Sequence, residues 1–158
     1  MRLSIYSRIV FSTIAVMQAG FSFADNSVQL ELRGLVPVNC TVNVNPSVKA
    51  SDLNIANGES NAVVGTLTEN CNAGNGYVVK IASLNKGKLI NPANAALSAA
   101  YQVQYDTAEG TIANNLTANR NQAQFSRQGK LAISFNGQNQ QVAAGTYSDT
   151  LNIIISAK

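Results

Sequence analysis

Residues 28–44 read VQLELRGLVPVNCTVNV, and nearly every even-numbered position in this stretch is apolar. Most of the odd-numbered positions between them are polar. This two-residue period is typical of an extended chain with one buried face and one solvated face. The stretch is about three times the usual strand length. Gly34 and Pro37 fall in its middle, where both residue types interrupt a strand, so the pattern predicts two consecutive extended segments.

The two segments have different expected roles. The second, residues 38–44, opens the folded domain, whereas the first, residues 28–36, has an apolar face without an obvious partner in its own chain. We interpret the first segment as a donor arm for another molecule. The alternatives are an ordinary first strand or a disordered terminus. The expected donor residues are Val28, Leu30, Leu32, Gly34 and Val36.

An N-terminal export signal precedes the arm. Residues 1–24 have a charged start with Arg2 and Arg8, a short apolar core, and a small-x-small cleavage site at Ser22-Phe23-Ala24. The apolar core is shorter than the roughly 20 residues of a membrane-spanning helix, which argues against the alternative of a transmembrane anchor. We therefore expect the mature chain to begin near Asp25.

The mature chain is close to neutral. Of the 11 basic residues, Arg2 and Arg8 leave with the signal, so nine remain against eight acidic residues. This balance gives no indication of nucleic-acid binding. The roughly 134 mature residues suffice for one domain with a single core. The expected organisation is a signal peptide at 1–24, a donor-strand extension at 25–37 and a β-sandwich domain at 38–158.

Two cysteines, Cys40 and Cys71, remain in a chain bound for an oxidising compartment. One disulfide is the natural inference, and closing a loop of about 30 residues contributes roughly 3–4 kcal/mol. The alternative is two free buried thiols. We predict no metal and no cofactor, because histidine is absent and two cysteines alone do not complete a tetrahedral ligand set.

The rest of the chain predicts strands and no long helix. Residues 85–88 are expected to form a hairpin turn, Asn136-Gly137 a tight turn, and the Asn- and Gln-rich residues 114–141 a polar loop region rather than a low-complexity tract. The chain is therefore predicted to be all-β. The expected strands are 63–71, 77–84, 89–90, 97–105, 112–116, 130–135 and 150–156.

The last expected strand also has an apolar face without an evident neighbour. Leu151, Ile153 and Ile155 occupy every second position along it, and the sequence ends at Lys158. An immunoglobulin-like sandwich needs a further strand here, and an exposed apolar edge favours aggregation unless it is covered. The alternative is a core strand completed by a neighbour within the same domain.

The surplus strand at the front and the missing strand at the back complement each other. An arm from one molecule can add a strand to another, with backbone hydrogen bonds along its length and alternate side chains in the core. Because donor and acceptor surfaces differ, such a contact propagates head to tail into a filament. We expect Leu151, Ile153 and Ile155 to line the acceptor groove.

Three features carry a resemblance to a known family: the alternating arm at 28–34, the pair Cys40 and Cys71, and the ending AGTYSDTLNI at 144–153. With them the whole mature chain resembles the fimbrial subunits of chaperone-usher pili of Gram-negative bacteria. The ending is also similar to spore coat protein U-like domains. The resemblance implies an incomplete immunoglobulin-like β-sandwich that is completed by a donor strand from another subunit.

The resemblance also implies a route and partners. A periplasmic chaperone would lend a strand and hold the C-terminal carboxylate, at Lys158, before an outer-membrane usher installs the arm of the next subunit. The product would be a cell-surface fimbrium for adhesion or biofilm formation. Its subunits would be identical or related, and its receptor is not indicated by the sequence.

Catalysis is poorly supported by this sequence. Without histidine, the common Ser-His and Cys-His arrangements are excluded. The eight acidic residues are scattered, and Asp106 with Glu109 reads as a solvated loop. We predict that the protein is not an enzyme. The alternative function is a secreted monomeric β-sandwich that binds carbohydrate or a surface, with sugars stacking on Tyr77, Tyr101, Tyr105 and Tyr147.

Overall fold

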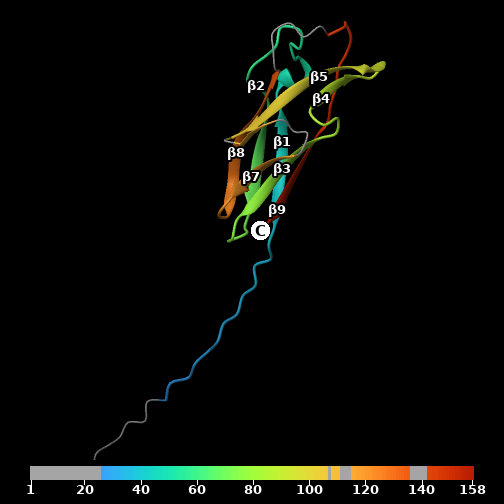
Figure 1. Ribbon diagram of the computed structural model, residues 1–158. Coiled ribbons are helices and arrows are strands. Elements are labelled where there is room, and N and C mark those ends of the chain that lie inside the picture. The colour runs from blue at the N-terminus through green and yellow to red at the C-terminus, as the bar shows by residue number, and fades with distance from the viewer. Residues whose placement is uncertain (1–25, 107, 111–114, 136–141) are drawn as a thin grey trace, which may run out of the picture. The chain divides into compact units, whose positions relative to one another are not determined.

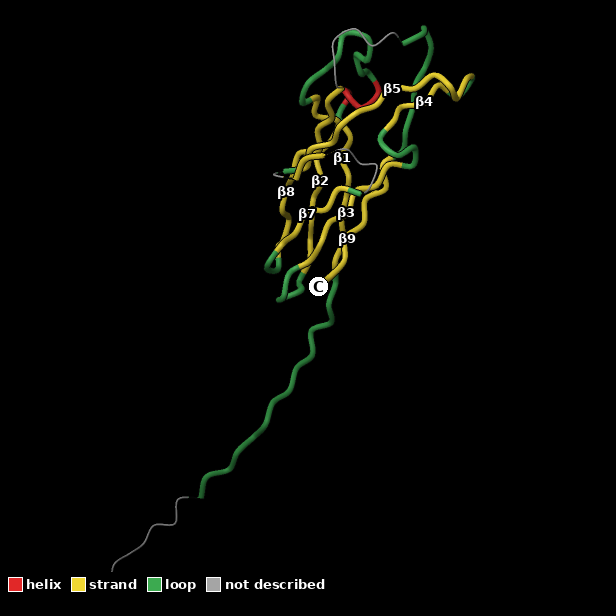
Figure 2. Tube along the Cα trace, viewed as in Figure 1, coloured by secondary structure: helices red, strands yellow, loops and turns green. Residues whose placement is uncertain are grey.

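The computed structural model describes residues 26–106, 108–110, 115–135 and 142–158 (Figure 1). The predicted export signal and the Asn136-Gly137 turn lie outside the described residues. The chain separates into two units, residues 1–35 and residues 36–158. The described part of the first unit has no regular secondary structure, and the second unit contains the described strands and one short helix (Figure 2).

The second unit is all-β. Its short 3-10 helix, η1, spans Val48–Ser51. The described strands are β1 (Cys40–Pro46), β2 (Ala62–Cys71), β3 (Tyr77–Ser83), β4 (Lys88–Asn91), β5 (Asn94–Tyr105), β6 (Ala108–Gly110), β7 (Leu116–Arg120), β8 (Gln124–Phe135) and β9 (Leu151–Ala157).

The strands form two antiparallel sheets, as predicted for an immunoglobulin-like β-sandwich. The larger sheet has the order β1-β2-β8-β5-β4, with β6 paired to β5. The smaller sheet has the order β7-β3-β9. Every described strand pair is antiparallel, which suits strands with one buried and one solvated face.

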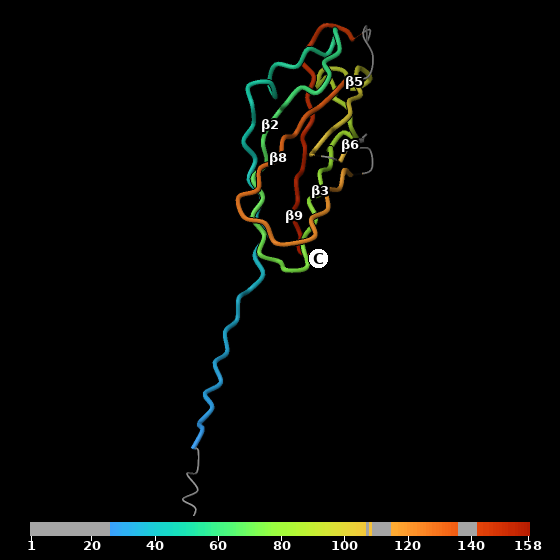
Figure 3. Tube along the Cα trace, turned by 90° about the vertical axis from the view of Figure 1, so that its left-hand side faces the viewer, coloured from blue at the N-terminus to red at the C-terminus, as the bar shows by residue number. Residues whose placement is uncertain are grey.

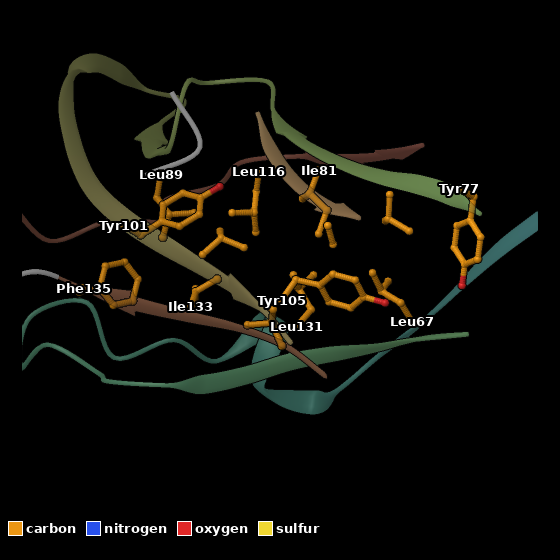
Figure 4. Packing of buried hydrophobic residues seen from close by; sticks show 14 of the residues in the cluster. Leu67, Tyr77, Ile81, Leu89, Tyr101, Tyr105, Leu116, Leu131, Ile133 and Phe135 are labelled. Atoms are coloured by element: carbon orange, nitrogen blue, oxygen red, sulfur yellow. The ribbon is translucent and has the colours of Figure 1, made fainter. Parts of the chain in front are cut away.

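The core lies between the two sheets. In β3, Tyr77, Val79 and Ile81 are almost fully buried while Lys80 between them is exposed, because successive side chains point to opposite faces. These residues pack in one cluster with side chains of the larger sheet, such as Leu67 (Figure 4). Burying an apolar side chain of this size stabilises the fold by about 1.5–3 kcal/mol.

The turn at residues 85–88 forms, but it does not close a hairpin. Lys86 and Gly87 both have positive φ, of 56° and 76°, as a tight turn of the expected kind requires. However, β3 pairs with β7 and β9, whereas β4 pairs with β5 in the other sheet. The prediction of a hairpin was wrong because both edges of β3 are already occupied, so the chain crosses between sheets here.

The polar stretch after residue 114 was also misread. Strand β8 begins at Gln124 instead of residue 130, and β7 runs from Leu116 to Arg120. Most of the strand predicted at 112–116 lies outside the described residues. The first half of β8 is polar because it pairs with the end of β2, where Glu69 faces Arg127. Arg127 pairs with the buried carboxylate of Glu69 at 3.4 Å and takes a position where a strand normally has an apolar side chain.

Candidate functional site

The edge strands β1 and β9, one from each sheet, lie on the same side of the sandwich and each have an open edge. β1 pairs only with β2, and β9 pairs only with β3, so within the described residues no strand occupies their other edges. β1 and β9 lie near each other without a ladder between them; Figure 3 shows β9 in red. Backbone donors and acceptors along these edges are therefore available to an added strand.

An apolar groove lies between these edges, with a volume of about 380 Å³. Val44 and Pro46 of β1 form one wall, and Leu151 and Ile153 of β9 form the other. The floor is formed by core side chains of the larger sheet, among them Val64, Tyr101, Leu131 and Ile133. The core of the sandwich is therefore accessible along this side.

The burial of paired residues shows that β9 lacks cover. Ile153 faces Ile81 in the ladder, and Ile155 faces Val79. The two β3 residues are 1% and 0% exposed, whereas both β9 residues are only half-buried. Leu151 and Ile153 line the groove, while Ile155 packs against the core outside it. Their role as acceptor residues stays a prediction. An added strand would bury the exposed remainder of all three.

The groove continues past the start of β9. A second hollow of about 470 Å³ lies between residues 50–55 and residues 145–149, sharing Leu53, Leu89 and Asp149 with the first. A third, of about 270 Å³, is lined by residues 53–56, 142–145 and Tyr147. The hollowed surface is thus longer than β9 itself.

Asp149 fixes the entry of the chain into β9. Its carboxylate accepts hydrogen bonds from the Tyr101 hydroxyl at 2.5 Å, from the Asn85 backbone N–H at 3.0 Å, and from the Ser83 hydroxyl. Burial, followed by the hydrogen bond to Asp149, raises the pKa of Tyr101 above its usual range, so this hydroxyl remains a donor. This anchoring was not predicted, because its partners are about 50 to 66 residues away in sequence.

The predicted donor residues lie in a segment without secondary structure. In residues 26–39 no strand is formed, and the side chains of Val28, Leu30, Leu32 and Val36 are each at least 80% exposed. Nothing lies within 4 Å of the position that a Cβ on Gly34 would occupy. The apolar side chains of the arm therefore have no partner among the described residues, and their role as a donor strand stays a prediction.

The disulfide between Cys40 and Cys71 is present. The two cysteines form the first pair of the β1–β2 ladder, so the bond fastens the beginning of β1 to the end of β2. Lys158 is exposed; its backbone N–H donates to the Gly76 carbonyl at 3.1 Å, and its ammonium donates to Asn121 at 3.3 Å.

Removing the disulfide should lower stability strongly. We expect the double variant Cys40→Ala, Cys71→Ala to lose about 3–4 kcal/mol in the free energy of unfolding, because the unfolded chain regains the freedom of a loop of about 30 residues. Urea unfolding measures this difference. Adding a reductant to the wild type should reproduce it and should leave the double variant unchanged, since the chain has no other cysteine; equal stability of oxidised and reduced protein would contradict the prediction.

A buried ionic cluster away from the groove was missed by the sequence reading. Glu69 is fully buried, and the guanidinium of Arg120 donates two hydrogen bonds to its carboxylate, at 2.8 and 3.0 Å. The hydroxyls of Tyr77 and Tyr105 also donate to it. Asp106 pairs with Arg120 at 2.5 Å and is mostly buried, so the expectation of a solvated loop was wrong for this residue.

The charge of Glu69 is retained in spite of its burial. Burial alone would raise the pKa of its carboxyl, but the hydrogen bonds from Arg120, Tyr105 and Tyr77 together outweigh it and hold this pKa below its usual range. Burial and the contact with Glu69 raise the pKa of Tyr77 and Tyr105 in turn. None of these residues lines the groove, so the cluster links the two sheets and leaves the groove apolar.

The tyrosines proposed for sugar stacking are not available. Tyr77, Tyr101 and Tyr105 are at most 3% exposed, and Tyr147 is half-buried with its hydroxyl donating to the Ala143 carbonyl. A sugar needs an open aromatic face, so this arrangement argues against the carbohydrate-binding alternative on these residues. Within the described residues, no three His, Cys, Asp or Glu side chains gather to hold a metal ion, and no helix is long and apolar enough to cross a membrane.

Comparisons with known proteins add little beyond the fold. No family model and no curated protein matches the sequence. Among solved structures, the E. coli Hda pilus minor tip subunit, HdaB, is similar with a TM-score of 0.46 and 12% sequence identity, over 75% of this chain and 84% of that one. A likeness at this level does not by itself assign a family or a function.

Proposed function

We propose that this protein is a structural, non-enzymatic pilus subunit that polymerises by donor-strand exchange. In this proposal the arm at residues 28–36 of one copy fills the groove between β1 and β9 of the next. The observation that carries the proposal is the coexistence, in one chain, of an apolar strand without cover and an apolar segment without a partner. In the polymer, the uncovered strand of one copy and the unpartnered segment of the next would bury each other, so neither would stay exposed to water.

The dimensions of arm and groove agree. The apolar positions of the arm, Val28 to Val36, span about 26 Å when extended, and the seven residues of β9 span about 20 Å. The part of the arm that extends past β9 would lie over the hollows that continue the groove beyond Leu151. Four arm side chains buried in this way would each contribute about 1.5–3 kcal/mol before the costs of association, so dissociation should be slow.

We infer that the arm binds antiparallel to β9. The smaller sheet is antiparallel throughout, and an antiparallel addition continues its hydrogen-bond pattern. The N-terminal end of the arm then lies beside Ala157, and its C-terminal end lies beside Leu151 and the hollows beyond it. The body of the donor copy therefore adjoins the start of β9 in the acceptor.

The proposal includes the assembly route that the sequence resemblance implies. The exported chain would be held in the periplasm by a chaperone that covers the groove and contacts the exposed Lys158, and an outer-membrane usher would then replace the chaperone strand with the next arm. The product is a fimbrium on the cell surface for adhesion or biofilm formation. The open, apolar groove supports a need for such temporary cover.

An unheated SDS gel tests the polymerisation. We expect the exported full chain to give a ladder of multimers that collapses to monomer on boiling, and a version lacking residues 25–36 to run as monomer alone. The truncated protein should remain folded, because the second unit contains the whole described core. Monomer in both lanes would overturn the proposed function, as would an unchanged ladder from the truncated chain.

A further inference from the structure

Phe125 is an exposed aromatic side chain at the beginning of β8. It is 72% exposed, whereas Tyr77, Tyr101, Tyr105 and Phe135 are buried. An isolated exposed apolar residue is common on protein surfaces. Phe125, however, lies at an irregularity in the β2–β8 ladder and lines a hollow together with Asn39.

A β-bulge turns Phe125 outward. Between the ladder pairs Cys71↔Gln124 and Glu69↔Arg127, β2 has one residue, Asn70, while β8 has two, Phe125 and Ser126. Ser126 has a positive φ of 54°, and its backbone N–H donates to the Asn70 side chain at 2.7 Å. Bulges are a common means of re-aiming a side chain, and the Asn70 hydrogen bond holds this one in place.

The root of the arm is fastened beside the bulge. The Asn72 side chain accepts a hydrogen bond from the Asn39 backbone N–H at 2.7 Å and donates one to the Pro37 carbonyl at 2.8 Å. Asn39 and Phe125 line the same hollow of about 190 Å³. Asn39 is three positions after Val36, the last apolar position of the arm, which corresponds to a span of about 10 Å.

We propose that Phe125 of the donor copy packs against the acceptor copy, at the end of its groove, and forms a second contact beside the inserted arm. The proposal rests on the proposed function. When the arm lies antiparallel to β9, its root reaches the hollow lined by residues 53–56, 142–145 and Tyr147 of the acceptor. Leu53, Ile55 and Tyr147 are half-buried there, so their exposed parts offer an apolar surface for Phe125.

Site-specific crosslinking tests this contact. A photoreactive benzoylphenylalanine replaces Phe125 in the full chain, and multimers are irradiated, boiled in SDS and digested. We expect a boiling-resistant band whose crosslinked peptide contains residues 53–56 or 142–147. The matched control carries the same analogue at Thr117, an exposed position on β7, and should give no such band.

The variant Phe125→Ser provides a second measurement. It should still form the SDS ladder, because the arm is intact, but its multimers should dissociate about tenfold faster in denaturant, since the second apolar contact is lost. Ile154→Ser, which alters another exposed apolar residue, should dissociate like the wild type.

The possible failures are distinguishable. If the full chain forms no multimers, the proposed function fails. If multimers form but position 125 crosslinks no better than position 117, or crosslinks to other residues, the inference about Phe125 is overturned while strand exchange stands. Crosslinking between copies that lack residues 25–36 would also overturn it, because the contact would then be independent of the arm.

Discussion

Two one-sided variants should each be monomeric alone and should form only a dimer when mixed. Ile153→Asp places a carboxylate in the wall of the groove, so this copy can donate its arm but cannot accept one. The double variant Leu30→Asp, Leu32→Asp has the opposite defect. Burying an unpaired carboxylate costs several kcal/mol, which corresponds to a loss of binding of more than about a thousandfold. Size-exclusion chromatography and unheated SDS gels measure the outcome.

Neighbouring residues supply matched controls for both defects. Ile154 is 59% exposed and follows Ile153 directly, with its side chain on the outer face of the sheet, so Ile154→Asp should polymerise like the wild type. Gln29→Asp is the matched control for the arm and should also polymerise like the wild type. Far-UV circular dichroism and a cooperative urea transition verify that Ile153→Asp remains folded. Polymerisation of a folded Ile153→Asp variant would contradict the assignment of the groove as acceptor.

Glu69→Ala should destabilise the domain by about 3–5 kcal/mol. The substitution removes the acceptor of hydrogen bonds from Arg120, Tyr77 and Tyr105 and leaves a mostly buried guanidinium without its bidentate partner. Urea unfolding measures the loss. The control is Glu59→Ala, whose ion pair with Lys49 is partly exposed and should matter by less than about 1 kcal/mol. Equal effects of the two substitutions would contradict a stabilising role of the buried cluster.

The same carboxylate predicts a dependence of stability on pH. The pKa of Glu69 is lower in the folded state than its ordinary value of 4.5, so the unfolded state takes up the proton first as the solution is acidified. The stabilisation is therefore complete above the unfolded pKa and is lost as the pH falls through the folded pKa. The free energy of unfolding of the wild type should decline below about pH 4.5 more steeply than that of Glu69→Gln. Parallel curves for the two proteins would contradict this.

The parts of the fold that follow a local pattern were predictable from the sequence. Strand β3 and most of β2, β5 and β9 follow from alternation, because the side-chain period of a strand depends only on neighbouring residues. The disulfide followed from having two cysteines in a chain with a predicted export signal. The strand at residues 124–130 was not predicted, because its inward positions do not show the apolar period. Arg127 pairs there with Glu69, and Gly129 leaves room for the Tyr105 ring.

The candidate site was predictable in part. The inward-facing residues Leu151 and Ile153 were identified from their spacing, and the structure places both in the groove wall. The opposite wall at Val44 and Pro46, the extension past Asp149 and the bulge at Phe125 were not foreseen. Each depends on contacts between residues that are far apart in the sequence.

The sequence by itself determined the alternating arm, the cysteine pair and the apolar face of the last strand, because each is a property of residue types and short spacings. Only the tertiary structure decided that β1 and β9 are left with open edges around a groove and that Glu69 meets Arg120, 51 residues away. The physical reason is that an open edge is defined by which strands pair. That pairing results from the packing of the two sheets around a common core, and no local pattern specifies it.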